Sequence, residues 1–261
     1  MTAPGAALVT GAARRLGREM ALYLARRGFD VAIHYSTSVA DAGATLADLR
    51  AIGVRAVALR ADLLDEAQAA DLVAQAATAL GRPVTLLVNN ASTFDYDNIR
   101  SATRGSWDRN LGTNLRAPFV LTQAFAAQVP QATVSADGML ARGLVVNMLD
   151  QRVLKLTPEF MTYTIAKMGL WAFTQTAARA LAPHVRVNAI GPGSTLRGAH
   201  QGQDQFDAQR AASILERGAN PDDITAALGY LVDAPAVTGQ LICVDGGQHL
   251  GWKTPDILGP A

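Results

Sequence analysis

The sequence is poor in cysteine and has no long apolar run. Cys243 is the only cysteine among 261 residues, so no disulfide can form within the chain, and a reducing compartment is expected. No apolar stretch reaches the length that crosses a membrane, and the first residues lack the basic start, apolar core and cleavage site of a signal peptide. We therefore expect a soluble cytoplasmic protein that does not enter a membrane.

The chain also lacks an excess of charge of either sign. Its 23 lysines and arginines nearly balance 22 aspartates and glutamates, and the charges are scattered. This pattern argues against a nucleic-acid-binding surface, although it leaves room for a local cationic pocket. No linker, repeat or long low-complexity segment interrupts the sequence, so residues 1–261 are expected to form a single domain. Hydrophobic residues make up 49% of the chain, which is enough for a substantial core.

Seven short apolar runs alternate with alanine- and leucine-rich amphipathic segments. The runs are continuous rather than alternating in polarity, which is typical of strands buried on both faces of a parallel sheet. They lie at residues 6–11, 29–35, 54–63, 84–92, 141–149, 184–192 and 239–247. Gly28, Gly53 and Gly81 each close one of the helical segments, as C-terminal caps do.

This alternation predicts an α/β protein: a single-domain, doubly wound Rossmann fold with a seven-stranded parallel sheet flanked by helices. The polar segment 194–211 carries few strand signals. Long irregular segments in compact domains are often binding loops, so a substrate loop is expected around residues 194–217.

The first predicted strand is followed by a glycine-containing turn, "TGAARRLG" at residues 10–17. A doubly wound fold places phosphate groups at this turn, where Gly11 and Gly17 would let the backbone approach a pyrophosphate. The three-glycine fingerprint is incomplete, because Arg15 stands where the middle glycine is expected. A tight turn with a solvated pair of arginines, Arg14 and Arg15, is therefore the alternative interpretation.

The second predicted strand lacks the acidic residue with which NAD(H)-binding proteins usually hold the ribose hydroxyls. It ends in "HYSTS", and the side chains of His34, Ser36, Thr37 and Ser38 are donors of the kind that a 2′-phosphate requires. Arg14 is expected to face the same phosphate. The sequence therefore favours NADP(H) over NAD(H).

The motif "YTIAK" places Tyr163 and Lys167 on one face of a predicted helix over residues 160–182. A phenol with an ordinary pKa of about 10 is a poor acid–base group near neutrality. A neighbouring ammonium favours the phenolate, so Lys167 is expected to lower the pKa of Tyr163.

These motifs occur in the order found in short-chain dehydrogenases/reductases, a family that essentially the whole chain resembles. The matching segments are "TGAARRLG", "ADL" at 61–63, "NNAS" at 89–92, "TNLRAPF" at 113–119, "YTIAK" at 163–167, "RVNAIGPG" at 186–193 and "VDGG" at 244–247. The resemblance implies that Tyr163 donates a proton, that Lys167 binds the nicotinamide ribose and tunes the tyrosine, and that Asn114 holds a water in a proton relay.

The resemblance also implies a binding site for NADPH/NADP⁺ and assembly as in the family's tetrameric members. The cofactor residues it implies are Gly11, Arg14, Arg15, Leu16, Gly17, His34, Tyr35, Ser36, Ser38, Asp62, Leu63, Asn90, Ala91, Ser92, Lys167, Pro192, Gly193 and Ser194. No metal is expected.

The chain departs from the family at the position of the catalytic serine. Most members carry a serine thirteen residues before the tyrosine, whereas this chain has Asp150 there and no serine between Ser135 and Ser194. Together with Arg15 and with Phe94 after "NNAST", this resembles the pteridine reductase branch, which includes dihydromonapterin reductases.

In that branch the arginine reaches the pyrophosphate and the substrate, the aromatic residue stacks on a flat pterin, and the aspartate works with the tyrosine. The resemblance therefore implies reduction of a dihydropterin or dihydromonapterin to the tetrahydro form by NADPH. Arg15, Phe94, Asp150 and Tyr163 are the implied substrate residues.

Other interpretations remain open. Phe94 is alternatively a core or loop aromatic, and Asp150 a residue that caps the turn after a strand. The chain is alternatively a reductase of another carbonyl or imine, or an NADP-binding regulator without activity, although retention of Tyr163, Lys167 and Asn114 argues against the regulator. The tail 249–260, with Trp252, either packs on its own subunit or reaches a neighbouring active site.

Overall fold

The computed structural model describes residues 5–198 and 201–252, and its central feature is a seven-stranded sheet. Every neighbouring pair of strands in this sheet is parallel. In spatial order the strands are β3 (Ala56–Arg60), β2 (Asp30–Tyr35), β1 (Ala6–Val9), β4 (Val84–Asn89), β7 (Gly143–Met148), β8 (Val185–Pro192) and β9 (Leu241–Val244). The predicted doubly wound Rossmann fold is confirmed.

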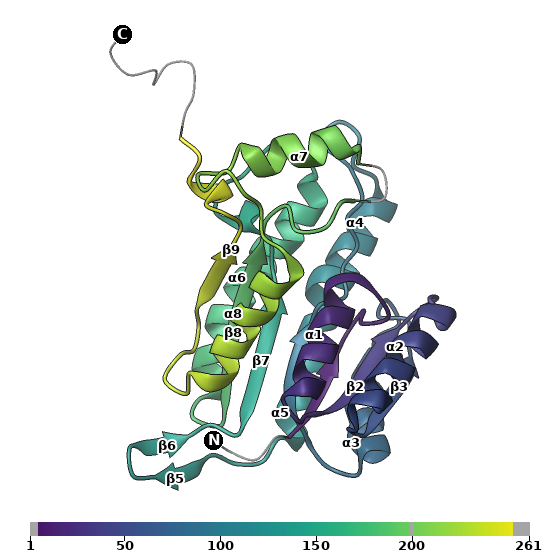
Figure 1. The fold of residues 1–261 in the computed structure, drawn as a ribbon, viewed down its shortest axis with the longest axis vertical. Coiled ribbons are helices and arrows are strands. Elements are labelled where there is room, and N and C mark those ends of the chain that lie inside the picture. Colours follow the sequence, from purple (N-terminus) through teal and green to yellow (C-terminus); the bar gives the residue numbers. More distant parts are fainter. Residues whose placement is uncertain (1–4, 199–200, 253–261) are drawn as a thin grey trace.

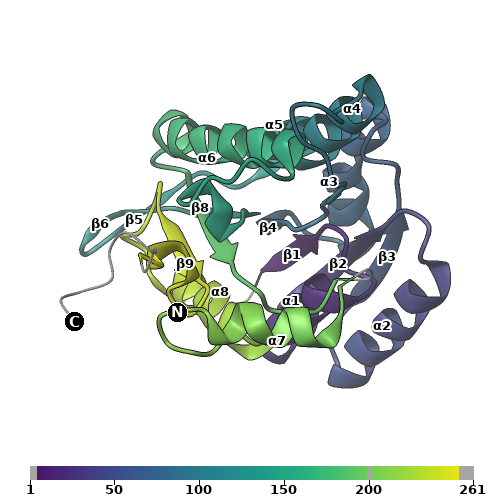
Figure 2. The same cartoon turned by 90° about the horizontal axis from the view of Figure 1, so that it is seen from above.

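Helices cover both faces of the sheet (Figures 1 and 2). One face carries α3 (Glu66–Leu80), α4 (Arg104–Leu111), α5 (Ala117–Gln128) and α6 (Met161–Leu181), and the other carries α1 (Arg15–Arg26), α2 (Val39–Ile52) and α8 (Pro221–Asp233). The apolar side chains of the strands alternate between two buried clusters, one against each helical layer. The central strands are therefore largely apolar along their length, because helices cover both of their faces.

Glycines end the first three helices, as predicted. Gly53 and Gly81 are the C-caps of α2 and α3 in the left-handed conformation, and Gly28 follows the C-cap of α1 with a φ of 86°. A residue without a Cβ adopts this conformation at little cost.

The sheet reverses its winding direction between β1 and β4. In open α/β sheets a crevice for ligands lies at this switch point, outside the carboxyl ends of the strands. The helix α7 (Gln203–Ala211) lies above this edge of the sheet, at the top of Figure 1. It occupies the second half of the segment 194–211, which the sequence predicted to be irregular.

A short hairpin of β5 (Thr133–Ser135) and β6 (Gly138–Leu140) was not predicted. Figure 1 shows it at the opposite end of the molecule from α7, so it does not contribute to the carboxyl edge of the sheet. Within the described residues, no helix combines the length and the apolar character needed to cross a membrane.

Candidate active site

The turn between β1 and α1 is built for close approach of the backbone. Gly11 has a φ of 61°, and a Cβ added to Gly17 would lie 2.4 Å from the carbonyl oxygen of Gly11. The side chain of Asn90 fastens the turn by donating to the carbonyls of Thr10 and Gly11, at 2.8 and 3.1 Å. At Gly11 and Gly17 the turn therefore has room for backbone only, as a phosphate-binding turn requires.

Arg15 occupies the place of the missing middle glycine in a left-handed backbone conformation, with a φ of 55°. Its guanidinium donates to the carbonyls of Leu196 and Arg197, at 3.2 and 3.0 Å. Arg15 therefore adopts the glycine-like backbone and ties the turn to the segment after β8. Arg14 is exposed and extended at the N-cap of α1, and no side chain caps that helix end.

His34 corrects one expectation from the sequence. Its side chain is 2% exposed; Nδ1 accepts from the N–H of Gly11 at 3.1 Å, and Nε2 lies 3.1 Å from the carbonyl oxygen of Ala61. Burial lowers the pKa of His34 and keeps the ring neutral. Both nitrogens are used within the protein, so the imidazole shapes the turn and cannot donate to a 2′-phosphate.

The residues after β2 lie at the surface. Ser36 and Thr37 are exposed and Ser38 is half-buried at the carboxyl end of the strand, beside half-buried Tyr35. At the end of β3, exposed Asp62 accepts from the N–H of Leu64 at 3.0 Å. These side chains border the same edge of the sheet as the turn, because β1, β2 and β3 are parallel neighbours.

Asp150 and Tyr163 form a direct hydrogen bond. Asp150 follows β7, Tyr163 lies in the first turn of α6, and the tyrosine hydroxyl donates to Asp150 Oδ2 at 3.0 Å. Asp150 Oδ1 accepts from the N–H of Arg152 at 2.8 Å and so also caps the 3₁₀ turn η2 (Gln151–Val153). The capping interpretation is therefore confirmed for Oδ1, while Oδ2 contacts Tyr163 as the active-site interpretation requires.

The pKa of Tyr163 differs from the expectation. Burial and then the charge of Asp150 raise it well above 10, because both favour the neutral phenol. The expected lowering by Lys167 is wrong in this arrangement. Tyr163 therefore keeps its proton across the physiological range.

Lys167 is buried below the tyrosine ring. Its Nζ donates to the carbonyl of Met148 at 2.7 Å and lies 5.5 Å from the centroid of the Tyr163 ring. Burial lowers the pKa of Lys167 to about 8, with Asp150 opposing the shift. The ammonium is thus poised to lose its charge just above neutral pH.

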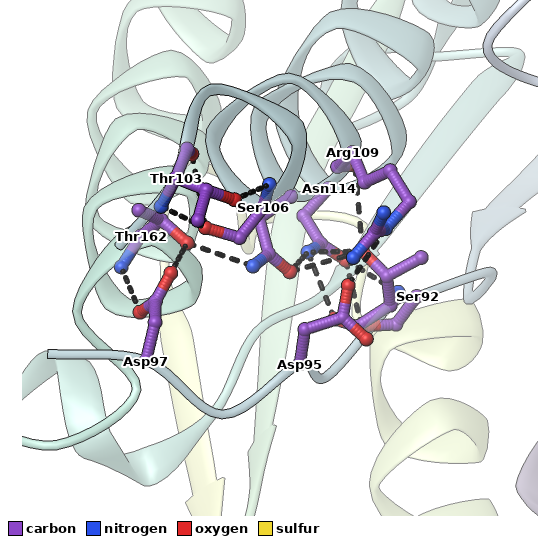
Figure 3. A network of polar contacts seen from close by, with 10 residues as sticks. Ser92, Asp95, Asp97, Thr103, Ser106, Arg109, Asn114 and Thr162 are labelled. Carbon is purple, nitrogen blue, oxygen red and sulfur yellow. Dashed lines mark hydrogen bonds and ion pairs between the residues drawn. The ribbon is translucent and has the colours of Figure 1, made fainter. Parts of the chain in front are cut away.

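Asn114 lies in a π-helical turn, η1 (Gly112–Arg116), between α4 and α5. Such turns are rare and are frequent at functional sites. Its Oδ1 accepts from the hydroxyl of Ser92 at 2.7 Å and from the N–H of Thr93 at 3.2 Å, and its Nδ2 donates to the carbonyl of Thr93 at 3.0 Å (Figure 3). The segment after β4 is thereby joined to the helices on this face of the sheet.

An aromatic cluster borders the tyrosine. Phe94 is 53% exposed, so the core interpretation is wrong. Its ring stacks on that of Phe160 with centroids 4.1 Å apart and meets the ring of Tyr163 edge-on at 4.7 Å. The ring of Phe160 also meets Tyr96 edge-on and the guanidinium of Arg152, at 5.2 Å in each case.

The sequence analysis missed Tyr96, Asp97 and Phe160 as neighbours of this site. Two signals could have found them: the aromatic and acidic run "FDYDNI" directly after "NNAST", and a phenylalanine three residues before the tyrosine. Phe160 also adopts a left-handed backbone conformation, with a φ of 55°, which cannot be predicted from the sequence.

The carboxyl ends of β8 and β9 close the other side of the site. The N–H of Gly193 donates to the carbonyl of Val244 at 3.1 Å, and a Cβ at Gly193 would lie 2.6 Å from that of Asp245. The next N–H, of Ser194, donates to Gln248 at 3.3 Å. Trp252 is 55% exposed, and residues 253–261 of the tail lie outside the described residues.

Comparison with known proteins gives consistent matches. A family model described as short chain dehydrogenase matches residues 5–207. FolM alternative dihydrofolate reductase 1 from Brucella suis, solved in complex with NADP, is 40% identical with a TM-score of 0.90, and the match covers 98% of this chain and 100% of that chain.

Two further proteins are similar over most of their length. A short chain dehydrogenase from Burkholderia cenocepacia J2315, solved in complex with NADP, is 31% identical with a TM-score of 0.83, covering 94% of this chain and 97% of that one. The 3-oxoacyl-(acyl-carrier-protein) reductase FabG from Staphylococcus epidermidis is 30% identical over 249 residues, covering 94% of this chain and 98% of the relative.

Proposed function

The chain belongs to the short-chain dehydrogenase family, and from that premise we propose that it is an NADPH-dependent reductase that transfers a hydride to a dihydropterin. The observation that carries this proposal is the hydrogen bond from Tyr163 to Asp150, a carboxylate at the family's serine position. The Brucella suis protein, whose name includes dihydrofolate reductase, supports a pterin-like substrate.

The turn after β1 fits a dinucleotide. Gly17 leaves no space for a side chain, and the first N–H groups of α1 have no side-chain cap, so they are free to bind a phosphate. Arg14, Ser36 and Ser38 would hold the 2′-phosphate, and Asn90 and Ala91 would border the ribose. NADP in the Brucella and Burkholderia structures supports this choice of cofactor.

Other side chains of the site have proposed positions along the same cofactor. Asp62 would lie beside the adenine, and Lys167 would bind the nicotinamide ribose. The segment of Pro192, Gly193 and Ser194 would lie alongside the nicotinamide. NADPH, when bound, supplies the hydride. We also propose that residues 194–217 form the substrate loop, which Arg15 holds through the carbonyls of Leu196 and Arg197.

Tyr163 is the proposed proton donor. Its high pKa keeps the hydroxyl protonated, and rotation of that hydroxyl away from Asp150 would present the proton to a ring nitrogen. Asn114 would hold a water in the relay that restores the proton. Chemistry of this kind typically contributes about 10²- to 10⁴-fold to the rate.

Asp150 favours a pterin over a ketone. Reduction of a ketone builds negative charge on oxygen, which an ionised carboxylate repels and to which it cannot donate. A pterin instead offers N–H and amino donors, which a carboxylate accepts. Phe94, which is 53% exposed, would stack on the flat ring.

A reductase of another carbonyl is the second candidate. The FabG relative supports it by name, and the fold serves both reactions equally. The missing serine donor argues against it. We further propose that the protein forms a homotetramer, since an apolar groove lined by Phe119, Ala126 and Phe173 runs along α5 and α6.

The test is a panel of substrates followed by the loss of NADPH absorbance. A dihydropterin should be reduced with a higher kcat/KM than simple ketones or acyl thioesters, and NADPH should be preferred over NADH. Tyr163→Phe should lose most of the turnover while still binding NADPH. Preferential reduction of an acyl thioester would instead favour the second candidate.

A further inference from the structure

Asp97 is a buried carboxylate to which the proposed chemistry gives no role. It is 1% exposed, on the segment that follows Phe94. Its Oδ1 accepts from the N–H of Thr162 at 3.0 Å, its Oδ2 accepts from the Thr162 hydroxyl, and its carbonyl accepts from the N–H of Met161 at 3.2 Å. Asp97 thus caps the start of α6, and Thr162 directly precedes Tyr163.

The same carboxylate begins a continuous hydrogen-bond network that runs through Asn114 and ends at Thr93 (Figure 3). Asn110 Nδ2 donates to the hydroxyl oxygen of Thr162 at 2.8 Å, and Asn114 Nδ2 donates to Asn110 Oδ1 at 3.3 Å. Asn114 Oδ1 then accepts from the N–H of Thr93 at 3.2 Å. The network connects the segment after β4, α4, η1 and α6.

The direction of every bond in this network is fixed at its two ends. At one end Asp97 is ionised and only accepts: burial alone raises its pKa, but the hydroxyl and N–H of Thr162 outweigh burial and hold the pKa below its usual value. At the other end the N–H of Thr93 only donates. Between them, Thr162 has one hydroxyl hydrogen, already given to Asp97, so Asn110 must present its NH₂ to Thr162 and its oxygen to Asn114.

We propose that Asp97 is a positioning residue, whose carboxylate sets the direction of this network and thereby holds Tyr163 and Asn114 in the arrangement needed for proton transfer. The proposal rests on the proton-transfer roles proposed for those two residues. Asp97 acts through Thr162 and Asn110 and does not itself touch a substrate.

Asp97→Asn is the direct test, because it keeps the size of the side chain and replaces one acceptor by a donor. The new NH₂ would face the Thr162 hydroxyl, whose hydrogen would then point at the NH₂ of Asn110. If Asn110 turned over, its NH₂ would meet that of Asn114, so one buried mismatch persists. A buried unsatisfied group is costly, and kcat should fall about tenfold or more. KM for NADPH should change less than about twofold, because the cofactor turn is untouched.

The double variant Asp97→Asn/Asn110→Asp is the matched rescue. The amide introduced at position 97 would accept from the N–H of Thr162 and donate to its hydroxyl oxygen, while the hydroxyl would donate to the carboxylate introduced at position 110. The other oxygen of that carboxylate would accept from Asn114 as before, which leaves Asn114 unturned. The double variant should therefore recover most of the kcat lost by Asp97→Asn. A purely stabilising cap would not be restored by a change at position 110.

The kinetic assay uses whichever substrate the wild type reduces fastest, so failure of the pterin assignment does not affect it. Hydrogen exchange at the N–H groups of Thr93 and Thr162 in the NADP-bound protein needs no turnover and should be faster in Asp97→Asn and slower again in the double variant. Should Asp97→Asn not fold, Thr162→Val breaks the network while keeping the shape and should show the same loss of kcat. Unchanged kcat in these variants, or a folded double variant with no recovery, overturns the proposal.

Discussion

At the scale of single residues, Arg15 combines an unfavourable backbone with a useful side chain. A non-glycine residue in the left-handed region costs on the order of 1 kcal/mol or more, so Arg15→Gly should raise the free energy of unfolding by up to about that amount. The same change removes two hydrogen bonds to the segment after β8. We therefore expect a higher Tm together with a several-fold higher KM for the substrate.

The comparison for this variant is Arg15→Asn, which tolerates the left-handed backbone but cannot reach the carbonyls of Leu196 and Arg197. It should raise KM as Arg15→Gly does, with a smaller gain in Tm. Thermal unfolding and steady-state kinetics on the same preparations measure both quantities. A lower Tm for Arg15→Gly would show that the guanidinium contacts outweigh the backbone strain.

Lys167 sets the expected pH dependence. Its pKa of about 8 means that the ammonium is charged below this pH and neutral above it. If the charge holds the nicotinamide ribose, kcat/KM for NADPH should fall about tenfold per pH unit above 8. Tyr163 does not produce this decline, because its pKa lies well above 10.

Lys167→Arg tests the assignment, because a guanidinium stays charged throughout this range. The variant should be less active overall, and its kcat/KM should show no decline near pH 8. A decline that persists in Lys167→Arg would belong to another group.

Residue identities were more predictable from the sequence than their surroundings. Tyr163 and Lys167 were found through the motif "YTIAK" and Asp150 through the resemblance to the family, and the structure brings the three together. The burial of His34 and the rise in the pKa of Tyr163 were not predicted, because both depend on packing between segments distant in sequence. Desolvation has no signature in a local motif.

At the scale of elements, the segment after β4 and the start of α6 form one aromatic platform. Phe160 stacks on Phe94 with ring centroids 4.1 Å apart, and Phe94 remains 53% exposed. Phe160→Ala should let the Phe94 ring move and raise KM for a dihydropterin several-fold, since aromatic pairs contribute roughly 0.5–1.5 kcal/mol beyond the area they bury. KM for NADPH should be unchanged.

Phe94→Ala removes the platform itself and should raise KM for the dihydropterin at least as much. Phe160→Tyr keeps the stacked ring and serves as the matched control. Equal KM values for wild type and Phe160→Ala, in a protein with unchanged Tm, would show that Phe160 does not support a substrate-binding ring.

The main elements follow from the sequence because a parallel sheet demands continuous apolar strands, and seven such runs were present. The hairpin of β5 and β6 was not predicted, because its strands span three residues each and are exposed except at Leu140. They therefore carry no burial pattern. The helix α7 was not predicted for the same reason, since none of its residues is buried. Amphipathic patterns reveal only elements that pack against a core.

At the scale of the whole molecule, the groove along α5 and α6 is the proposed interface between subunits. Ala126→Arg puts a charge into this groove and should yield a smaller assembly than the tetramer proposed for the wild type, measured by size-exclusion chromatography with light scattering. Ala70→Arg on the exposed side of α3 is the control and should leave the mass unchanged. A wild-type protein that elutes as a monomer would contradict the proposed assembly.

The central claim is that the carboxylate of Asp150, at the family's serine position, favours a dihydropterin over a ketone. Its most direct test is the ratio of dihydropterin to simple-ketone turnover in the wild type and in Asp150→Ser. A serine hydroxyl donates to a developing oxyanion, and the carboxylate accepts from ring N–H groups. The ratio should fall at least about tenfold in Asp150→Ser, through slower dihydropterin reduction and unchanged or faster ketone reduction. Equal dihydropterin reduction by the two proteins across the pH range would contradict the account and leave Asp150 as a turn residue.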